Sequence, residues 1–230
     1  MTQTGNRLFH IQMDINVTQA ARALAPSLTH TGLRDESLLL KTTLVEATQG
    51  PLIRPWRLHT QHGPCAIVLG YSASSPEDIQ QRLGLATPAV RQAVEAVYGH
   101  EMPGFSVGQR LRFALRMVPT IRVTGHGEQD AFLYAVNKHP DEKQVRGGVY
   151  TDYLTQRLAG ASIDTVNLEG FQLRKLTRRK RDGWAQRTFP TVDMMGALTV
   201  TDAVAFRTLL VTGIGRQRGF GYGMLRLEAA

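Results

Sequence analysis

Residues 209–227 read LLVTGIGRQRGFGYGMLRL, an apolar, helix-like run that leads into a glycine-rich loop and a short strand. Glycine adopts positive φ without steric cost and lets a backbone approach a bulky ligand. Two arginines within the loop supply planar, permanently charged donors that suit phosphate. We therefore predict that this loop contacts an RNA backbone, through Gly213, Gly215, Arg216, Arg218, Gly219 and Gly221. An ordinary glycine turn before an edge strand is the alternative.

The glycine spacing differs from that of two familiar nucleotide-binding loops. Gly213 to Gly219 reads G-x-G-x-x-x-G, one residue longer than the dinucleotide-binding fingerprint. That fingerprint also lies between a strand and a following helix, whereas the order here is helix, loop, strand. A Walker loop requires a Gly-Lys pair, and the sequence contains none. We therefore expect no cofactor.

The composition is that of a globular protein with an excess of positive charge. The chain has 230 residues, of which 42% are hydrophobic and 20% charged, and its formal net charge is +8. The positive charge is carried by 22 arginines and only 5 lysines. Because arginine stacks on bases and forks onto phosphates, nucleic acid is the expected partner. A generally basic surface is the alternative.

The sequence also indicates a compartment. No apolar run approaches the ~18 residues that a membrane-spanning helix needs. The first seven residues hold no apolar signal core. A single cysteine excludes an internal disulfide framework. We therefore expect a cytoplasmic protein with no membrane partner.

The first half of the chain shows alternating strand and helix patterns. A helix can begin after Asn16 or Thr18, and another at Ser75, where a cap precedes a proline and two acids. Strands are expected at residues 8–15, 38–45, 66–71 and 110–118. The last of these alternates basic and apolar side chains, which predicts one cationic face. The order β-α-β-β-α-β is that of a ferredoxin-like unit.

The second half has a more degenerate version of the same pattern, beyond a joint at Pro119. We expect a helix at 141–158, strands at 166–176 and 191–200, and a helix that Asp202 caps. The predicted fold class is therefore α+β, with two tandem ferredoxin-like (RRM-like) domains, a basic β-hairpin and a C-terminal glycine-rich loop. The expected domains are residues 1–118 and 119–230.

Residues 174–187 read RKLTRRKRDGWAQR, with seven basic residues and one acid. Asp182-Gly183 is a strong hairpin-turn signal, so the charges are expected on a two-stranded ribbon. Such a ribbon can clamp the phosphates of an RNA stem. The predicted contacts are Lys175, Arg178, Arg179, Lys180, Arg181 and Arg187, extended by Lys143, Arg146 and Arg157 from the preceding helix. A solvated charged hairpin and ordinary exposed helix charges are the alternatives.

Metal binding is not expected from the sequence. His59, His62 and Cys65 have ligand side chains but lack a second pair of ligands, and a Gly-Pro turn intervenes. No Gly-x-Ser-x-Gly elbow and no paired-acid cluster for two-metal nuclease chemistry occur. We therefore predict no metal site.

Taken together, these motifs make the chain similar to the CRISPR-associated repeat-RNA endoribonucleases of the RAMP superfamily, and it most resembles their subtype E form. The resemblance is carried by residues 109–118, 153–158, 195–200 and 213–227. Relatives from type IV systems have the same loop and stay open as an alternative. The resemblance implies metal-independent cleavage of precursor CRISPR RNA. It also implies retention of the product within a Cascade-like complex, so CRISPR repeat RNA and other subunits are the implied partners.

In that family the ribose 2′-OH attacks the adjacent phosphate and leaves a 2′,3′-cyclic phosphate and a 5′-OH. A histidine on the first helix usually serves this reaction. At that position the present sequence has Arg22, which can stabilise phosphate charge. His30, at the helix end or in the following loop, titrates near neutrality and can act as acid or base, with an ordinary surface histidine as the alternative. A non-catalytic RNA-binding subunit, a backbone-type RAMP protein and a general RNA chaperone are the alternative functions.

Overall fold

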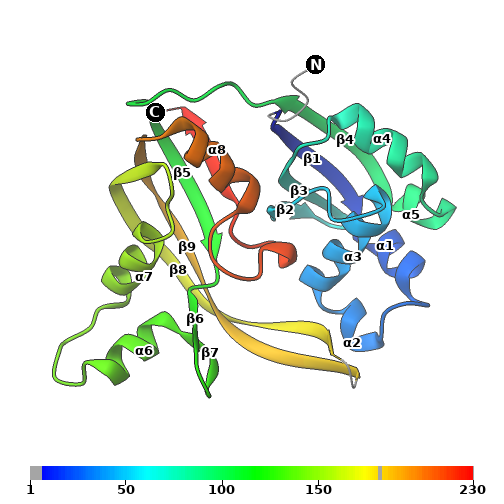
Figure 1. The fold of residues 1–230 in the computed structure, drawn as a ribbon. Coiled ribbons are helices and arrows are strands. Elements are labelled where there is room, and N and C mark those ends of the chain that lie inside the picture. Colours follow the sequence, from blue (N-terminus) through cyan, green and yellow to red (C-terminus); the bar gives the residue numbers. More distant parts are fainter. Residues whose placement is uncertain (1–6, 181–182, 230) are drawn as a thin grey trace. The chain divides into compact units, whose positions relative to one another are not determined.

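The structure is a computed structural model that describes residues 7–180 and 183–229, apart from the side chains of residues 30, 31, 180 and 229. The chain forms two compact units, shown in Figure 1. The first unit comprises the described residues up to Pro103, together with Lys175–Arg187 and Arg218–Gly221. The second unit comprises Gly104–Arg174, Thr188–Gln217 and the residues from Tyr222 onward.

The first unit is built on a four-stranded antiparallel sheet in the order β2-β3-β1-β4. Its strands are β1 Phe9–Asn16, β2 Trp56–His62, β3 Cys65–Ser72 and β4 Val94–Glu101. Its helices are α1 Val17–Leu24, α2 His30–Leu33, α3 Glu36–Thr48, α4 Pro76–Leu85 and α5 Pro88–Ala93. Along β1, every second side chain is buried, which confirms the predicted alternation. This strand order and pairing are those of a ferredoxin-like unit.

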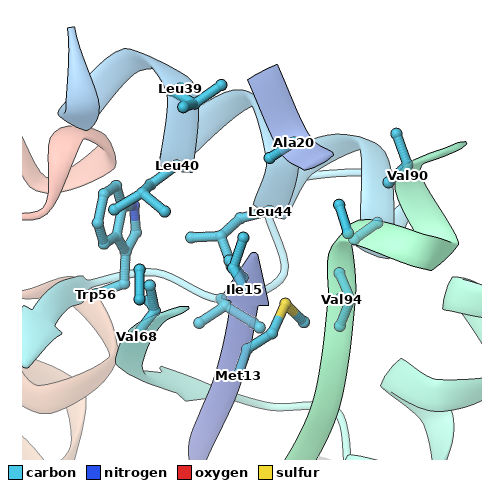
Figure 2. Packing of buried hydrophobic residues seen from close by; sticks show 14 of the residues in the cluster. Met13, Ile15, Ala20, Leu39, Leu40, Leu44, Trp56, Val68, Val90 and Val94 are labelled. Carbon is cyan, nitrogen blue, oxygen red and sulfur yellow. The ribbon is translucent and has the colours of Figure 1, made fainter. Parts of the chain in front are cut away.

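The core of the first unit lies between this sheet and its helices. Figure 2 shows Met13 and Ile15 of β1 packed below Leu44 of α3, and Leu40 beside the ring of Trp56. Trp56 is only 3% exposed, although it lies at the start of the edge strand β2. A large aromatic side chain in this position contributes a substantial share of the apolar area that the unit buries.

The predicted strand at 38–45 is wrong, because these residues belong to helix α3. Leu38, Leu39, Leu40 and Leu44 are all buried, and a short apolar run buried on most sides does not distinguish a helix from a strand. The decisive local signal is Asp35, whose side chain accepts a hydrogen bond from the amide of Leu38 and caps the helix. The edge strands β2 and β4 were missed, because their exposed residues weaken the alternation.

The second unit has a four-stranded sheet in the order β10-β5-β9-β8 and a small two-stranded sheet, β6-β7. The strands are β5 Arg110–Met117, β6 Thr120–Val123, β7 Gly127–Asp130, β8 Ala161–Lys180, β9 Gly183–Val200 and β10 Leu225–Ala229. The helices are α6 Ala131–Lys138, α7 Arg146–Thr155 and α8 Ala203–Thr212, whereas the 3-10 helix η1 Arg218–Phe220 belongs to the first unit. Asp202 caps α8 as predicted. Helix α7 is shorter than the expected 141–158, with Gly147 and Gly148 in its first turn.

The division into units differs from the expected boundary after residue 118. Strand β5 pairs with β9 and β10, so it is a strand of the second sheet, and the units separate between Pro103 and Gly104. Strand pairing joins residues far apart in the chain, so the local pattern of residues 110–118 predicts a strand but not its partners. The long strands β8 and β9, yellow to orange in Figure 1, are divided between the units, and only Lys175–Arg187 belongs to the first.

Candidate nucleic-acid interface

A cationic cluster surrounds Phe220 of η1 in the first unit. The Nζ atom of Lys41, on α3, lies 4.3 Å from the centroid of the Phe220 ring. The Cζ atom of Arg178, on β8, lies 5.6 Å from the same centroid. Phe220 itself is half-buried and packs against the hydrophobic core. The ring therefore brings two cations from different elements near one another, and we call Lys41, Arg178 and Phe220 the Phe220 cluster.

The surroundings of Lys41 in this cluster lower its pKa. Burial lowers the pKa of Lys41, and the positive charges of Arg178 and Arg54 lower it further. Two cations that act on a half-buried lysine generate a positive potential at that place. An anionic group such as a phosphate would offset this repulsion. A lysine with a lowered pKa also releases its proton more readily than an ordinary surface lysine.

The glycine-rich loop packs against Trp56. The indole Nε1 of Trp56 donates a hydrogen bond to the carbonyl oxygen of Gly219, at 3.2 Å. Gly221 has φ +88°, and a Cβ atom there would lie 2.8 Å from the Trp56 ring. Gly213 and Gly215 also have positive φ, of 72° and 75°. Backbone geometry and packing therefore require at least Gly221 as glycine, and contact of the four glycines with RNA stays a prediction.

The basic hairpin is anchored on the first unit. Its Thr177 amide donates a hydrogen bond to Asp35 Oδ2, and Trp184 packs against the hydrophobic core. Lys175, Arg179 and Arg187 remain exposed, and Arg178 and Arg218 are half-buried. The side chain of Lys180 and the whole of Arg181 lie outside the described residues. The strand pair with exposed cations is present as predicted, and its contact with RNA phosphates stays a prediction.

The predicted contacts in the second unit have internal partners. Arg216 forms an ion pair with Glu128 of β7. Arg157 lies 3.6 Å from the Tyr153 ring centroid and donates a hydrogen bond to the Tyr153 carbonyl oxygen at 3.0 Å. Lys143 is exposed in the segment before α7. Arg216 and Arg157 therefore contribute to the internal packing of this unit, and their contact with RNA stays a prediction.

The guanidinium of Arg146 contacts two aromatic rings, a carboxylate and a hydroxyl group within the second unit. Its guanidinium lies 4.2 Å from the ring centroids of both Phe132 and Phe171. It also donates to Asp130 at 3.3 Å and to the Tyr150 hydroxyl at 2.6 Å. Burial and the Asp130 charge raise the pKa of Tyr150. These contacts join β7, α6, α7 and β8, so Arg146 contributes to the internal packing of this unit, and its contact with RNA stays a prediction.

The predicted cationic face of β5 is partly neutralised. Its three arginines each pair with a carboxylate of the second unit: Arg110 with Asp164, Arg112 with Glu228 and Arg116 with Asp193. The separations are 3.3, 3.9 and 2.8 Å. Because the charges are offset locally, this face attracts a polyanion less than the alternation in the sequence indicated.

The two predicted catalytic residues lie on neighbouring helices of the first unit. Arg22 is exposed in the last turn of α1. His30 begins α2, after the N-cap Thr29, and its side chain lies outside the described part of the structure. The roles of both residues stay predictions.

Lys41 was missed as a functional candidate. The signal was present, since it is the one charged residue in the run LLLKTTLV, at 38–45. A charged side chain within an apolar run is unusual, because burial of a charge costs free energy. Because residues 38–45 were expected to form a strand, no functional role was predicted for Lys41.

The described part of the chain shows neither a metal-binding cluster nor a membrane-spanning helix. Over residues 7–180 and 183–229, no group of three or more His, Cys, Asp or Glu side chains could hold a metal ion. None of the helices in the same ranges is long and apolar enough to span a membrane.

Comparison with known proteins places the chain in a family. The family model described as "CRISPR associated protein" matches residues 8–228. The chain belongs to this CRISPR-associated protein family. None of the curated proteins matches the sequence.

Solved structures of CRISPR proteins have the same fold. The CRISPR endoribonuclease Cse3 bound to a 19-nucleotide RNA has a TM-score of 0.69 at 18% identity, over 98% of this chain and 100% of that one. Thermus thermophilus Cse3, bound to an RNA that represents a pre-cleavage complex, gives 0.59 at 20%, over 96% and 99%. A chain of a CRISPR RNA-guided surveillance complex gives 0.62 at 14%, over 96% and 100%. The likeness confirms the predicted tandem ferredoxin-like fold of this CRISPR-associated protein.

Proposed function

We propose that this CRISPR-associated protein binds the stem-loop of CRISPR repeat RNA and cleaves the precursor transcript without a metal ion. The observation that carries the proposal is the Phe220 cluster, in which Lys41 and Arg178 approach one aromatic ring and Lys41 has a lowered pKa. The proposal is supported by family membership and by a fold similar to RNA-bound Cse3.

The reaction is a transfer within the RNA chain. The ribose 2′-oxygen attacks the adjacent phosphorus and forms the P–O2′ bond, while the P–O5′ bond breaks. We assign proton donation to the departing 5′-oxygen to Lys41, because its lowered pKa favours release of a proton. Arg178 stabilises the negative charge that develops on the phosphorane oxygens. His30 accepts the 2′-hydroxyl proton, and Arg22 contributes positive charge.

Binding of the stem relies on the exposed cations of the hairpin. Lys175, Arg179 and Arg187 are exposed on β8 and β9, and Lys180 and Arg181 follow at the predicted turn. Each contact with a phosphate releases a counterion, so the affinity should depend strongly on salt. The hairpin thus supplies affinity, while the Phe220 cluster supplies chemistry.

The protein then remains with its product. One relative of similar fold is a chain of a CRISPR RNA-guided surveillance complex. We propose that this chain likewise keeps the mature RNA and acts in the cytoplasm as a subunit of a Cascade-like complex. The second candidate function is a non-catalytic RNA-holding subunit, which the absence of a histidine at the position of Arg22 favours.

The test is incubation of the purified protein with labelled repeat RNA in EDTA, beside the same RNA carrying 2′-deoxyribose at the cut site. Cleavage in EDTA that disappears with the 2′-deoxy substrate supports the endoribonuclease. Tight binding with no cleavage supports the RNA-holding subunit instead. The variant Lys41→Ala should lose cleavage, whereas Lys138→Ala, at an exposed lysine of α6, is the matched control.

A further inference from the structure

Asp35 makes two hydrogen bonds with its two carboxylate oxygens. Its Oδ1 atom accepts from the amide of Leu38 at 3.1 Å and caps helix α3. Its Oδ2 atom accepts from the backbone amide of Thr177 in strand β8. Both bonds lie within the first unit, although the residues are 142 positions apart in the chain. One side chain therefore joins the start of α3 to the basic hairpin.

Each of the joined elements carries a cation of the Phe220 cluster. Lys41 lies six residues after Asp35, about 9 Å along the helix at 1.5 Å per residue. Arg178 directly follows Thr177 on β8. When both ends of the Asp35 bridge are made, the backbone positions from which these two side chains start are fixed relative to each other. The bridge thus controls whether Lys41 and Arg178 reach the same ring.

The bridge also reaches the second strand of the hairpin. The Thr177 hydroxyl accepts a hydrogen bond from Gln186 Nε2 of β9 at 3.3 Å, and Thr177 is only 1% exposed. A backbone amide bonded to a carboxylate is a charge-assisted interaction, stronger than a bond between neutral groups. Through Thr177, the Asp35 bridge therefore holds both strands of the hairpin, β8 and β9.

A simple helix cap does not require this arrangement. Ser, Thr, Asn and Asp all cap helices well, and one oxygen is sufficient. Asp202 illustrates this in the second unit, because its Oδ1 alone accepts from both Val204 and Ala205. At position 35 both oxygens accept, and only a carboxylate offers two acceptors. Asparagine would retain one acceptor and present an NH₂ group, which cannot accept from the Thr177 amide.

We propose that Asp35 is a positioning residue that holds the basic hairpin against α3, so that Arg178 and Lys41 converge on Phe220. Its effect on cleavage rests on the proposed function, whereas its effect on the hairpin does not. Loss of the bridge lets Arg178 move away from Lys41, and RNA cleavage is then impaired more than RNA binding.

The experiment compares Asp35→Asn with Asp202→Asn, which makes the same chemical change at a cap that uses one oxygen. Amide hydrogen exchange is measured in the full chain. In Asp35→Asn we expect faster exchange over Lys175–Arg187 and unchanged protection over Glu36–Thr48. In Asp202→Asn both segments should behave as in the wild type. Asp35→Ser, which also caps with one oxygen, provides a second variant in case the first does not fold.

Cleavage kinetics supply the second readout. We expect kcat to fall roughly tenfold to a hundredfold, the cost of small misplacements in an active site, with KM changed much less. The charges that act on Lys41 come from Arg178 on β8 and Arg54 before β2. If Arg178 moves away, the decline of kcat at high pH should shift to higher pH.

Each outcome decides a separate point. Unchanged hairpin exchange in both Asp35 variants would overturn the positioning role, whatever happens to the rate. Faster exchange with wild-type kcat would overturn its link to cleavage. If the wild-type protein does not cleave repeat RNA at all, the proposed function fails, and the exchange measurement still decides whether Asp35 holds the hairpin.

Discussion

Trp56 and Gly219 are joined by a hydrogen bond from the indole Nε1 to the carbonyl oxygen, at 3.2 Å. The bond ties edge strand β2 to η1 in the middle of the glycine-rich loop. Because Gly221 also meets the indole ring, the loop is shaped around one buried tryptophan. This relationship places Phe220, between the two glycines, next to Lys41. Packing against Trp56 therefore explains the conformation of this part of the loop without any bound ligand.

Gly221→Ala should destabilise the protein by about 1–3 kcal/mol, because the residue has φ +88° and its Cβ would enter the Trp56 ring. The free energy of unfolding in urea measures the effect. Gly219→Ala is the matched control, since φ is not positive there and a Cβ would meet nothing within 4 Å. Equal stability of the two variants would contradict the close packing of Gly221 on Trp56.

Lys41→Arg should retain RNA binding and lose cleavage by a factor of about 10² or more, because arginine keeps the charge but does not release a proton. Single-turnover cleavage and filter binding measure the two effects. In the wild type the rate should decline as the pH rises through the pKa of Lys41, which burial and nearby arginines lower. That decline therefore occurs below the usual titration range of lysine. A pH profile that is unaltered in Lys41→Arg would argue against Lys41 as the acid.

The hairpin cations should determine the salt dependence of RNA binding. Lys175→Ala combined with Arg179→Ala removes two exposed charges, so the slope of log affinity against log salt should become less steep by roughly 1–2. The control combines Arg110→Ala with Arg112→Ala, two arginines paired with carboxylates. Affinity titrations at several salt concentrations measure the slopes. If both double variants change the slope equally, general charge rather than the hairpin drives binding.

Two features of Gln217 destabilise the native state: its backbone conformation and its buried side-chain amide. Its φ is +62°, the left-handed region that glycine favours, and its Nε2 is buried with no hydrogen-bond partner among the described residues. Gln217→Gly should therefore stabilise the protein by about 1 kcal/mol, the net of relieved strain and added unfolded-state entropy. Gln217→Ala removes the amide but keeps the strained backbone, so it should be less stable than Gln217→Gly. Thermal unfolding compares them, and a Gln217→Gly protein less stable than the wild type would indicate a structural role for the side chain.

The sequence by itself determined the elements that depend on neighbouring residues. The alternation of β1, the start of α4 after the cap Ser75 and the cap of Asp202 at α8 are all present as predicted. These signals are local, because each is made by hydrogen bonds and side-chain periods within a few residues. The basic hairpin and the glycine-rich loop belong to the same class, since their turn residues and charges are contiguous in the chain.

Only the tertiary structure decided which residues meet across the chain. It shows the run around Lys41 to be a helix, gives β5 to the second sheet, and pairs Arg216 and Arg146 with carboxylates. The convergence of Lys41 and Arg178 on Phe220, and the bridge from Asp35 to Thr177, join positions far apart in sequence. The free energies of these contacts depend on packing, desolvation and charges that lie close together in space. A local pattern contains none of that information, because it does not specify which distant side chain will lie beside it.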